Sequence, residues 1–357
     1  MSVFVKTLSD IVALVLQALR LSVLLPAAVF VGLNAVFVFP QFKDTLLLQA
    51  LQSNETEYPA TILLLMAVLI VAYALAVLNI PIIRLFEGYP WALRFPGNYF
   101  RRAHLRRAAA LQSAIDFYDM EARAKRREAK QETDATRHQM ALEAAEDLAL
   151  RGNLAKAQLA WFYPQHNPWR TLPTRLGNVI ASAEEFPGHL YGLDAVTFWP
   201  FLSPILSKEG YAPFVERERA AFDFLLNMAV LTLVFGAELI YADLLLAQAT
   251  WLSVAAKLGG AAIVAFAFYM VSIQGALSWG YTIRTAFVLY RDKLRERLGL
   301  IKPEGFYEER VLWQKATRFY HDQDVSSGKH IFAYPVPEEP DISGTFNLKR
   351  QEHEAES

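Results

Sequence analysis

Four long apolar segments constrain what this chain can fold into more than any other feature of its sequence. They cover residues 21–39, 60–83, 224–247 and 258–280. The hydrocarbon core of a bilayer is about 30 Å thick, and a helix of roughly 20 apolar residues crosses it. Only the third segment contains charged side chains, Glu238 and Asp243. The pattern predicts a mainly α-helical, polytopic membrane protein with four transmembrane helices in two hairpins and a helical cytoplasmic insert.

Basic residues near the ends of membrane spans mark the cytoplasmic side. The connection at 40–59 has one basic residue, Lys43, and the connection at 248–253 has no charge. Arginines and lysines instead follow the second and fourth spans: Arg84, Arg94, Arg101, Arg102, Arg106, Arg107, Arg284, Arg291, Lys293, Arg295 and Arg297. Both termini and the central insert are therefore expected in the cytoplasm.

The predicted hairpins, at 21–83 and 224–283, leave several segments outside the membrane. Residues 1–20 are expected to form an amphipathic helix that leads into the first span, because a long apolar stretch without a cleavage site follows them. Residues 284–322 are expected to be cytoplasmic helices. Residues 323–357 contain prolines, acidic residues and little apolar content, and are expected to be a disordered tail.

Residues 84–160 are expected to be charged cytoplasmic helices, because they are rich in Ala, Arg, Glu, Lys and Gln. Apolar side chains recur there for about two heptads at the spacing of a coiled-coil seam. They are Leu105, Ala108, Leu111, Ile115, Tyr118 and Ala122. Charged residues replace the seam after Ala122. Two interpretations stay open: a projecting stalk or oligomerisation element, and a solvated helical hairpin bent near Arg127.

Residues 161–223 form a juxtamembrane region rich in prolines and aromatic residues. Proline ends or kinks a helix, so the helices of this region are expected to be short. One of them is predicted over 174–186. A further helix is expected from residue 214 and should run without a break into the third span, because charged residues give way to apolar ones there without a Gly or Pro.

Several motifs of this region resemble a known group of sequences. They are PTRLGN at 173–178, AEEFP at 183–187, YGLDAV at 191–196 and WP at 199–200. Together they resemble a widespread family of uncharacterised bacterial multi-pass membrane proteins, over about the second half of the chain. The resemblance implies a bacterial cytoplasmic (inner) membrane location and implies no activity.

Four charged residues of these motifs are candidates for a cytoplasmic ion-pair cluster: Arg175, Glu184, Glu185 and Asp194. A structural ion-pair network is the favoured interpretation, because such networks often imitate functional clusters. A ligand site at this cluster is the alternative.

Ionisable and polar side chains inside the spans are candidates for function, because burying them in lipid is costly. Asp243 and Lys257 lie seven residues before and after position 250, so an antiparallel pair of spans would place them at the same depth. We expect them to form an ion pair, with snorkelling of both side chains to the surface as the alternative.

Glu238 lies near the centre of the third span. An interhelical hydrogen bond from its protonated carboxyl is the favoured interpretation. The alternative is a proton or cation pathway, in which Gln274 and Asn79 would be further polar groups.

The sequence offers little support for an enzyme. It contains no cysteine, which excludes disulfides and thiolate chemistry, and no motif for a nucleotide, cofactor or metal. A net charge of −1 gives no basic field for nucleic acid. The predicted function is a non-enzymatic, oligomeric scaffold or signalling component in the bilayer, which associates with itself or with a cytoplasmic protein. The alternative is a channel or transporter that uses Glu238.

Overall fold

The computed structural model describes residues 21–42, 58–165, 167–246, 249–328 and 331–333. This part of the chain is almost entirely α-helical, with short 3-10 turns and one isolated β-bridge. The predicted helix at 1–20 and the tail beyond residue 333 lie outside the described residues.

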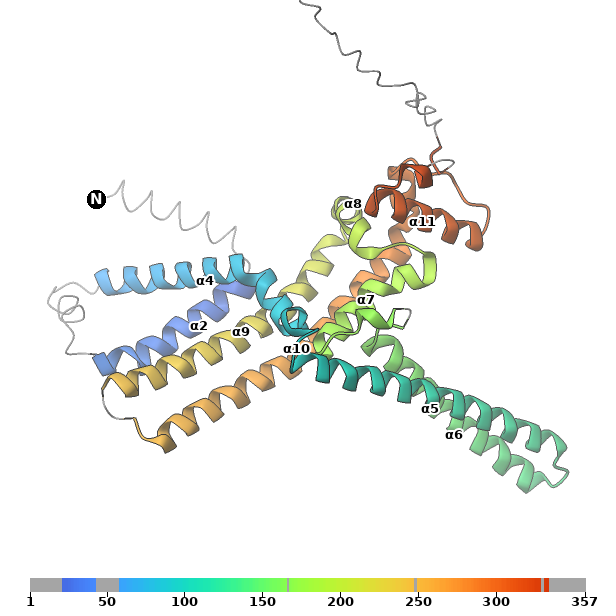
Figure 1. Ribbon diagram of the computed structural model, residues 1–357, viewed down its shortest axis with the longest axis horizontal. Coiled ribbons are helices and arrows are strands. Elements are labelled where there is room, and N and C mark those ends of the chain that lie inside the picture. Colours follow the sequence, from blue (N-terminus) through green and yellow to red (C-terminus); the bar gives the residue numbers. More distant parts are fainter. Residues whose placement is uncertain (1–20, 43–57, 166, 247–248, 329–330, 334–357) are drawn as a thin grey trace, which may run out of the picture.

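Four helices are long and apolar enough to cross a membrane: α2 (Leu21–Phe37), α4 (Tyr58–Glu87), α9 (Ala212–Leu245) and α10 (Trp251–Arg297). They correspond to the four apolar segments, which confirms the mainly helical fold with four candidate spans. α2 packs against α4 and α9, and α9 packs along α10. The C-terminal ends of α2 and α9 and the N-terminal ends of α4 and α10 gather at one end of the bundle, away from the other helices (Figure 1).

Two of these helices continue well beyond their apolar parts. α9 begins at Ala212, so the helix expected from residue 214 does run unbroken into the third span. α10 is 47 residues long and extends past both ends of the apolar segment 258–280. Its N-terminus is capped by Thr250, whose Oγ1 accepts a hydrogen bond of 3.1 Å from the Ser253 backbone N–H. No proline follows until after Arg297, so nothing stops the helix earlier.

A compact body forms on the extension of α10. α7 (Arg175–Tyr191), α8 (Ala195–Lys208) and α11 (Phe306–His321) pack there around a shared core. Phe198, Phe287 and Trp313 are completely buried, and the rings of Phe198 and Trp313 meet edge to face at 5.3 Å. The membrane bundle and the body therefore share the helix α10.

α7 is longer than the predicted helix at 174–186. It continues through Pro187 and ends where Gly192 adopts a left-handed conformation, with φ of 79°. Proline removes only one backbone hydrogen bond when the preceding turn can tolerate it. Glycine reaches positive φ without strain, so Gly192, and not the proline, stops the helix.

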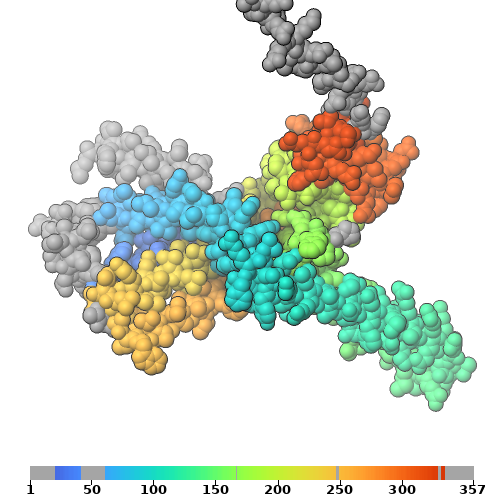
Figure 2. Space-filling model, in the orientation of Figure 1, coloured from blue at the N-terminus to red at the C-terminus, as the bar shows by residue number. Residues whose placement is uncertain are grey.

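An arm of two antiparallel helices leaves the body (Figure 2). α5 (Gly97–Gln131) and α6 (Ala135–Phe162) pack side by side, and the predicted seam lies between them, with Ile115 and Ala122 buried. The arm is therefore a helical hairpin, and its bend lies at 132–134 and not near Arg127. Asp134 explains the position, because its side chain caps α6 by accepting a 2.9 Å hydrogen bond from the Arg137 N–H.

The expectation that the tail is disordered from residue 323 is wrong for its first part. Residues 325–328 form a 3-10 turn, and Ile331 is buried in the core of the body. The Ile331 carbonyl accepts a hydrogen bond of 2.9 Å from Ile301, and the Ala333 N–H donates to Gly299 at 2.8 Å. A short apolar stretch is enough to hold this segment, because it completes an existing core.

Candidate functional site

A charged cavity of about 380 Å³ lies where the membrane bundle meets the body. We call it the interfacial cavity. Its lining comes from α4, α7, α8, α9, α10 and the 3-10 turns after α4 and before α7: Ile80, Ile83, Arg84, Glu87, Tyr89, Arg170, Ile180, Glu184, Val196, Arg219, Phe222 and Trp279. The cavity thus combines acidic, basic and aromatic groups with an apolar wall.

The C-terminus of α4 is fixed against the N-terminus of α7. Thr174 Oγ1 donates a 2.8 Å hydrogen bond to the Glu87 carbonyl and accepts one of 3.0 Å from the Gly177 N–H. Gly177 is required by this approach, because a Cβ there would lie 2.3 Å from the same Glu87 carbonyl oxygen. Glu87 itself is only 7% exposed and lines the cavity. A carboxyl group is therefore held at the base of the cavity by rigid backbone contacts.

Glu184 of α7 faces the same cavity. Burial raises the pKa of its carboxyl above the ordinary value, the Arg170 guanidinium opposes this shift, and the nearby Asp194 adds to it. Arg170 Nη2 lies 3.0 Å from Glu184 Oε2. Burial also raises the pKa of the Tyr89 hydroxyl, and the charge of Glu184 raises it further. The cavity therefore disfavours additional negative charge at its acidic side.

A second polar group lies beside the cavity on α9. Asp223 is buried, and its Oδ2 lies 3.6 Å from Arg219 Nε. Asn79 of α4 donates a hydrogen bond of 3.2 Å to the same oxygen. Asn79 is a polar candidate of the sequence, and the structure places it here and not on a route through the membrane with Glu238. The burial of Asp223 could not be predicted from the sequence, because Asp223 lies directly before an apolar segment, where an exposed charged residue is expected.

The predicted cytoplasmic cluster does not form as one network. Arg175 lies over the ring of Phe162 at 4.5 Å, and Glu184 pairs with Arg170. Asp194 caps α8 and accepts hydrogen bonds of 2.8 and 2.6 Å from the Thr197 backbone and hydroxyl. Arg175 and Glu184 are nine residues apart on one helix, a rise of about 13.5 Å, which separates their charges. Glu185 is buried on α7.

The predicted pair between Asp243 and Lys257 is present. Lys257 Nζ lies 2.6 Å from Asp243 Oδ1, and Ser253 donates a hydrogen bond of 2.7 Å to Asp243 Oδ2. Lys257 also lies 3.3 Å from the Leu239 carbonyl. The pair links the end of α9 to the start of α10. This is the position predicted from the sequence, because the two residues are equally far from position 250.

The other two intramembrane candidates are not brought together. Glu238 Oε2 is buried and has no hydrogen-bond partner among the described residues, so the interhelical hydrogen bond predicted for this carboxyl is not found there. The neighbouring face of α9 is apolar, which explains the lack of a donor. Gln274 is exposed on the outside of α10.

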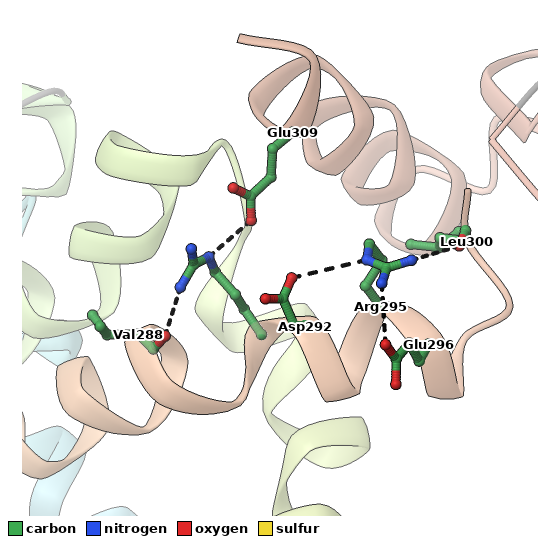
Figure 3. Close-up of polar contacts among 7 residues, drawn as sticks. Val288, Asp292, Arg295, Glu296, Leu300 and Glu309 are labelled. Atoms are coloured by element: carbon green, nitrogen blue, oxygen red, sulfur yellow. Dashed lines mark hydrogen bonds and ion pairs between the residues drawn. The ribbon is translucent and has the colours of Figure 1, made fainter. Parts of the chain in front are cut away.

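Arginines that follow the fourth span serve mainly to hold the body together. Arg284 is buried, donates to the Ser182 hydroxyl at 2.8 Å and lies 4.0 Å from the ring centre of Trp161. Farther along α10, Arg291 pairs with Glu309 of α11 at 2.8 Å, and Arg295 donates to the Leu300 carbonyl at 3.2 Å (Figure 3). The rule that basic residues mark the cytoplasmic side of a membrane protein singles out these arginines, but it does not predict that they pack inside the body.

Within the described part of the chain, no group of three or more His, Asp or Glu side chains is placed to hold a metal ion. No family model matches the chain, and no curated protein and no solved structure is found to match it, so the family resemblance noted in the sequence stays a prediction.

Proposed function

We propose that the chain is a scaffold of the bacterial cytoplasmic membrane that presents its helical arm to a second copy of itself. In this proposal the spans form two hairpins, 21–83 and 224–283, and the insert between them and both termini lie in the cytoplasm. The arginines after the second and fourth spans support that orientation, and the family resemblance supports the bacterial membrane location.

The observation that carries the proposal is the arm. A 35-residue helix such as α5 is about 50 Å long, so the arm reaches far beyond the body. Large apolar side chains project from it: Phe117, Met120, Leu150 and Leu154 are 53% to 62% exposed. Phe117 and Met120 lie three residues apart on α5, and Leu150 and Leu154 lie four apart on α6, so each pair shares one face of its helix. Contiguous apolar groups on an otherwise charged surface are typical of protein interaction sites. A second arm offers the same kind of surface, so it is a suitable occupant.

The test uses the purified full-length chain in detergent. We expect light scattering to give a mass above that of one protein chain, and the double substitution Leu150→Glu with Leu154→Glu to reduce it to one chain. The matched control is Leu252→Glu, at the other end of the molecule, where the side chain is 63% exposed.

A second measurement makes the contact specific. The chain has no cysteine, so Met120→Cys introduces a single thiol. A short bifunctional maleimide should join two chains through this thiol, but not through Trp169→Cys, which lies off the arm and is 83% exposed. A single-chain mass at every concentration, or equal cross-linking of both variants, would contradict the proposal.

A transport function is the second candidate, and Glu238 favours it. A carboxyl oxygen that is buried in a span without a hydrogen-bond partner is costly to maintain, and such groups often belong to ion or proton pathways. Proteoliposomes with wild type and Glu238→Gln test this function by proton and cation flux. Flux that the substitution abolishes supports it, and the lack of any flux in the wild type excludes it.

A further inference from the structure

We infer that the interfacial cavity binds the headgroup of a bilayer lipid that carries both a phosphate and a primary ammonium group, as phosphatidylethanolamine does. The inference goes beyond the scaffold proposal and does not depend on self-association of the arm.

The position of the cavity favours a lipid over a soluble ligand. Its wall includes Ile80 and Ile83, which belong to the apolar part of α4, and Phe222 and Trp279 at the ends of the apolar parts of α9 and α10. Ile80 is 60% exposed on the outside of the bundle, where acyl chains would lie. The cavity is therefore open at the level of the membrane surface, next to the lipid.

The charges inside the cavity match a zwitterion. Glu87 is 93% buried in the lining, and no described residue donates a hydrogen bond to its carboxyl group. A buried carboxyl without a donor is costly, so a ligand that brings an ammonium group stabilises it. A primary ammonium donates hydrogen bonds, whereas the trimethylated ammonium of phosphatidylcholine has no N–H to donate.

The order of the charges along α4 matches the order in a lipid headgroup. Arg84 is exposed at the rim of the cavity, one helical turn before Glu87 and about 4.5 Å closer to the apolar part of the helix. In phosphatidylethanolamine the phosphate lies on the membrane side and the ammonium lies beyond a two-carbon linker. Arg84 is therefore placed for the phosphate, and Glu87 for the ammonium. Glu184 lines the same cavity, where it is paired with Arg170.

The test measures lipid binding to the purified full-length chain by native mass spectrometry, with phosphatidylethanolamine, phosphatidylcholine and phosphatidylglycerol of the same acyl chains. We expect phosphatidylethanolamine to bind about tenfold more tightly than phosphatidylcholine, since a hydrogen bond to a charged group contributes about 1.5 kcal/mol or more. We expect Glu87→Gln to abolish this preference. The matched control, Glu209→Gln, changes an acid to an amide in the body, where Glu209 pairs with Lys293.

Arg84→Gln provides a second variant in case Glu87→Gln does not fold, because Arg84 is exposed and its contact with the ring of Tyr89, at 5.9 Å, lies at the surface. It should weaken binding of phosphatidylethanolamine several-fold. Equal binding of phosphatidylethanolamine and phosphatidylcholine by the wild type would overturn the inference. A preference that survives Glu87→Gln would also overturn it, as would unchanged binding of phosphatidylethanolamine by Arg84→Gln. Glycerophosphoethanolamine, which has the headgroup but no acyl chains, distinguishes the source. If it binds as tightly as the lipid, the site serves a soluble ligand and the lipid assignment is wrong.

Discussion

At the scale of single residues, some interactions between polar side chains can be predicted from the sequence. The burial of other polar side chains cannot. Asp243 and Lys257 are found by symmetry about the turn that joins their helices, because depth in a membrane follows directly from distance along each helix. Glu184 and Asp223 acquire their environments from helices distant in sequence. Spacing along the chain contains no information about such contacts.

Glu184 should make stability depend on pH. Burial raises the pKa of its carboxyl in the folded state, so the folded state prefers the protonated form. Its contribution to stability is complete below the unfolded pKa of about 4.3 and is lost as the pH rises through the higher folded pKa. Thermal unfolding of Glu184→Gln, measured from about pH 4 to pH 8, should therefore lose less stability with rising pH than the wild type. If the two proteins show the same pH profile, the carboxyl does not have this role; Glu209→Gln is the control.

The pair between Asp243 and Lys257 should behave as one unit. Reversing one charge, in Asp243→Lys or Lys257→Asp, places two like charges within contact distance at the edge of the membrane. We expect each single change to lower the unfolding temperature by several degrees, and the double change to recover most of the loss. Independent, additive effects of the two substitutions would show that the side chains do not interact in the membrane.

At the scale of helices, Gly236 allows α9 and α10 to approach each other closely. A Cβ at Gly236 would lie 2.5 Å from the Cβ of Ala261, so Gly236→Ala must push the helices apart. Overpacking of this kind costs about 1–3 kcal/mol. Gly259→Ala is the matched control, since nothing lies within 4 Å of a Cβ at that position. Unfolding by heat in detergent should show a lower midpoint for the first variant only. An equal rise of the midpoint in both variants would contradict overpacking, because alanine would then act through its higher helix propensity alone.

The helices themselves were largely predictable, and their ends less so. Long apolar runs specify spans because their length must match the bilayer. The ends depend on local details such as the Asp134 cap, which moves the bend of the arm to 132–134, and Gly192, which stops α7 beyond Pro187. The interfacial cavity could not be predicted, because it is created by helices distant in sequence that meet only in the folded chain.

At the scale of the whole molecule, the body and the arm lie at one end of the bundle, and the start of α10 lies at the other (Figure 1). Thiols introduced at the two ends should therefore react from opposite sides of the membrane. A membrane-impermeant maleimide should label Trp251→Cys in intact spheroplasts, because Trp251 is 82% exposed before the fourth span. It should label Met140→Cys, which is 65% exposed near the tip of the arm, only after lysis.

Labelling of both thiols in intact spheroplasts would place the arm outside the cell and exclude a cytoplasmic scaffold. Labelling of Met140→Cys alone would invert the topology, and the basic residues would then have failed as a guide to orientation.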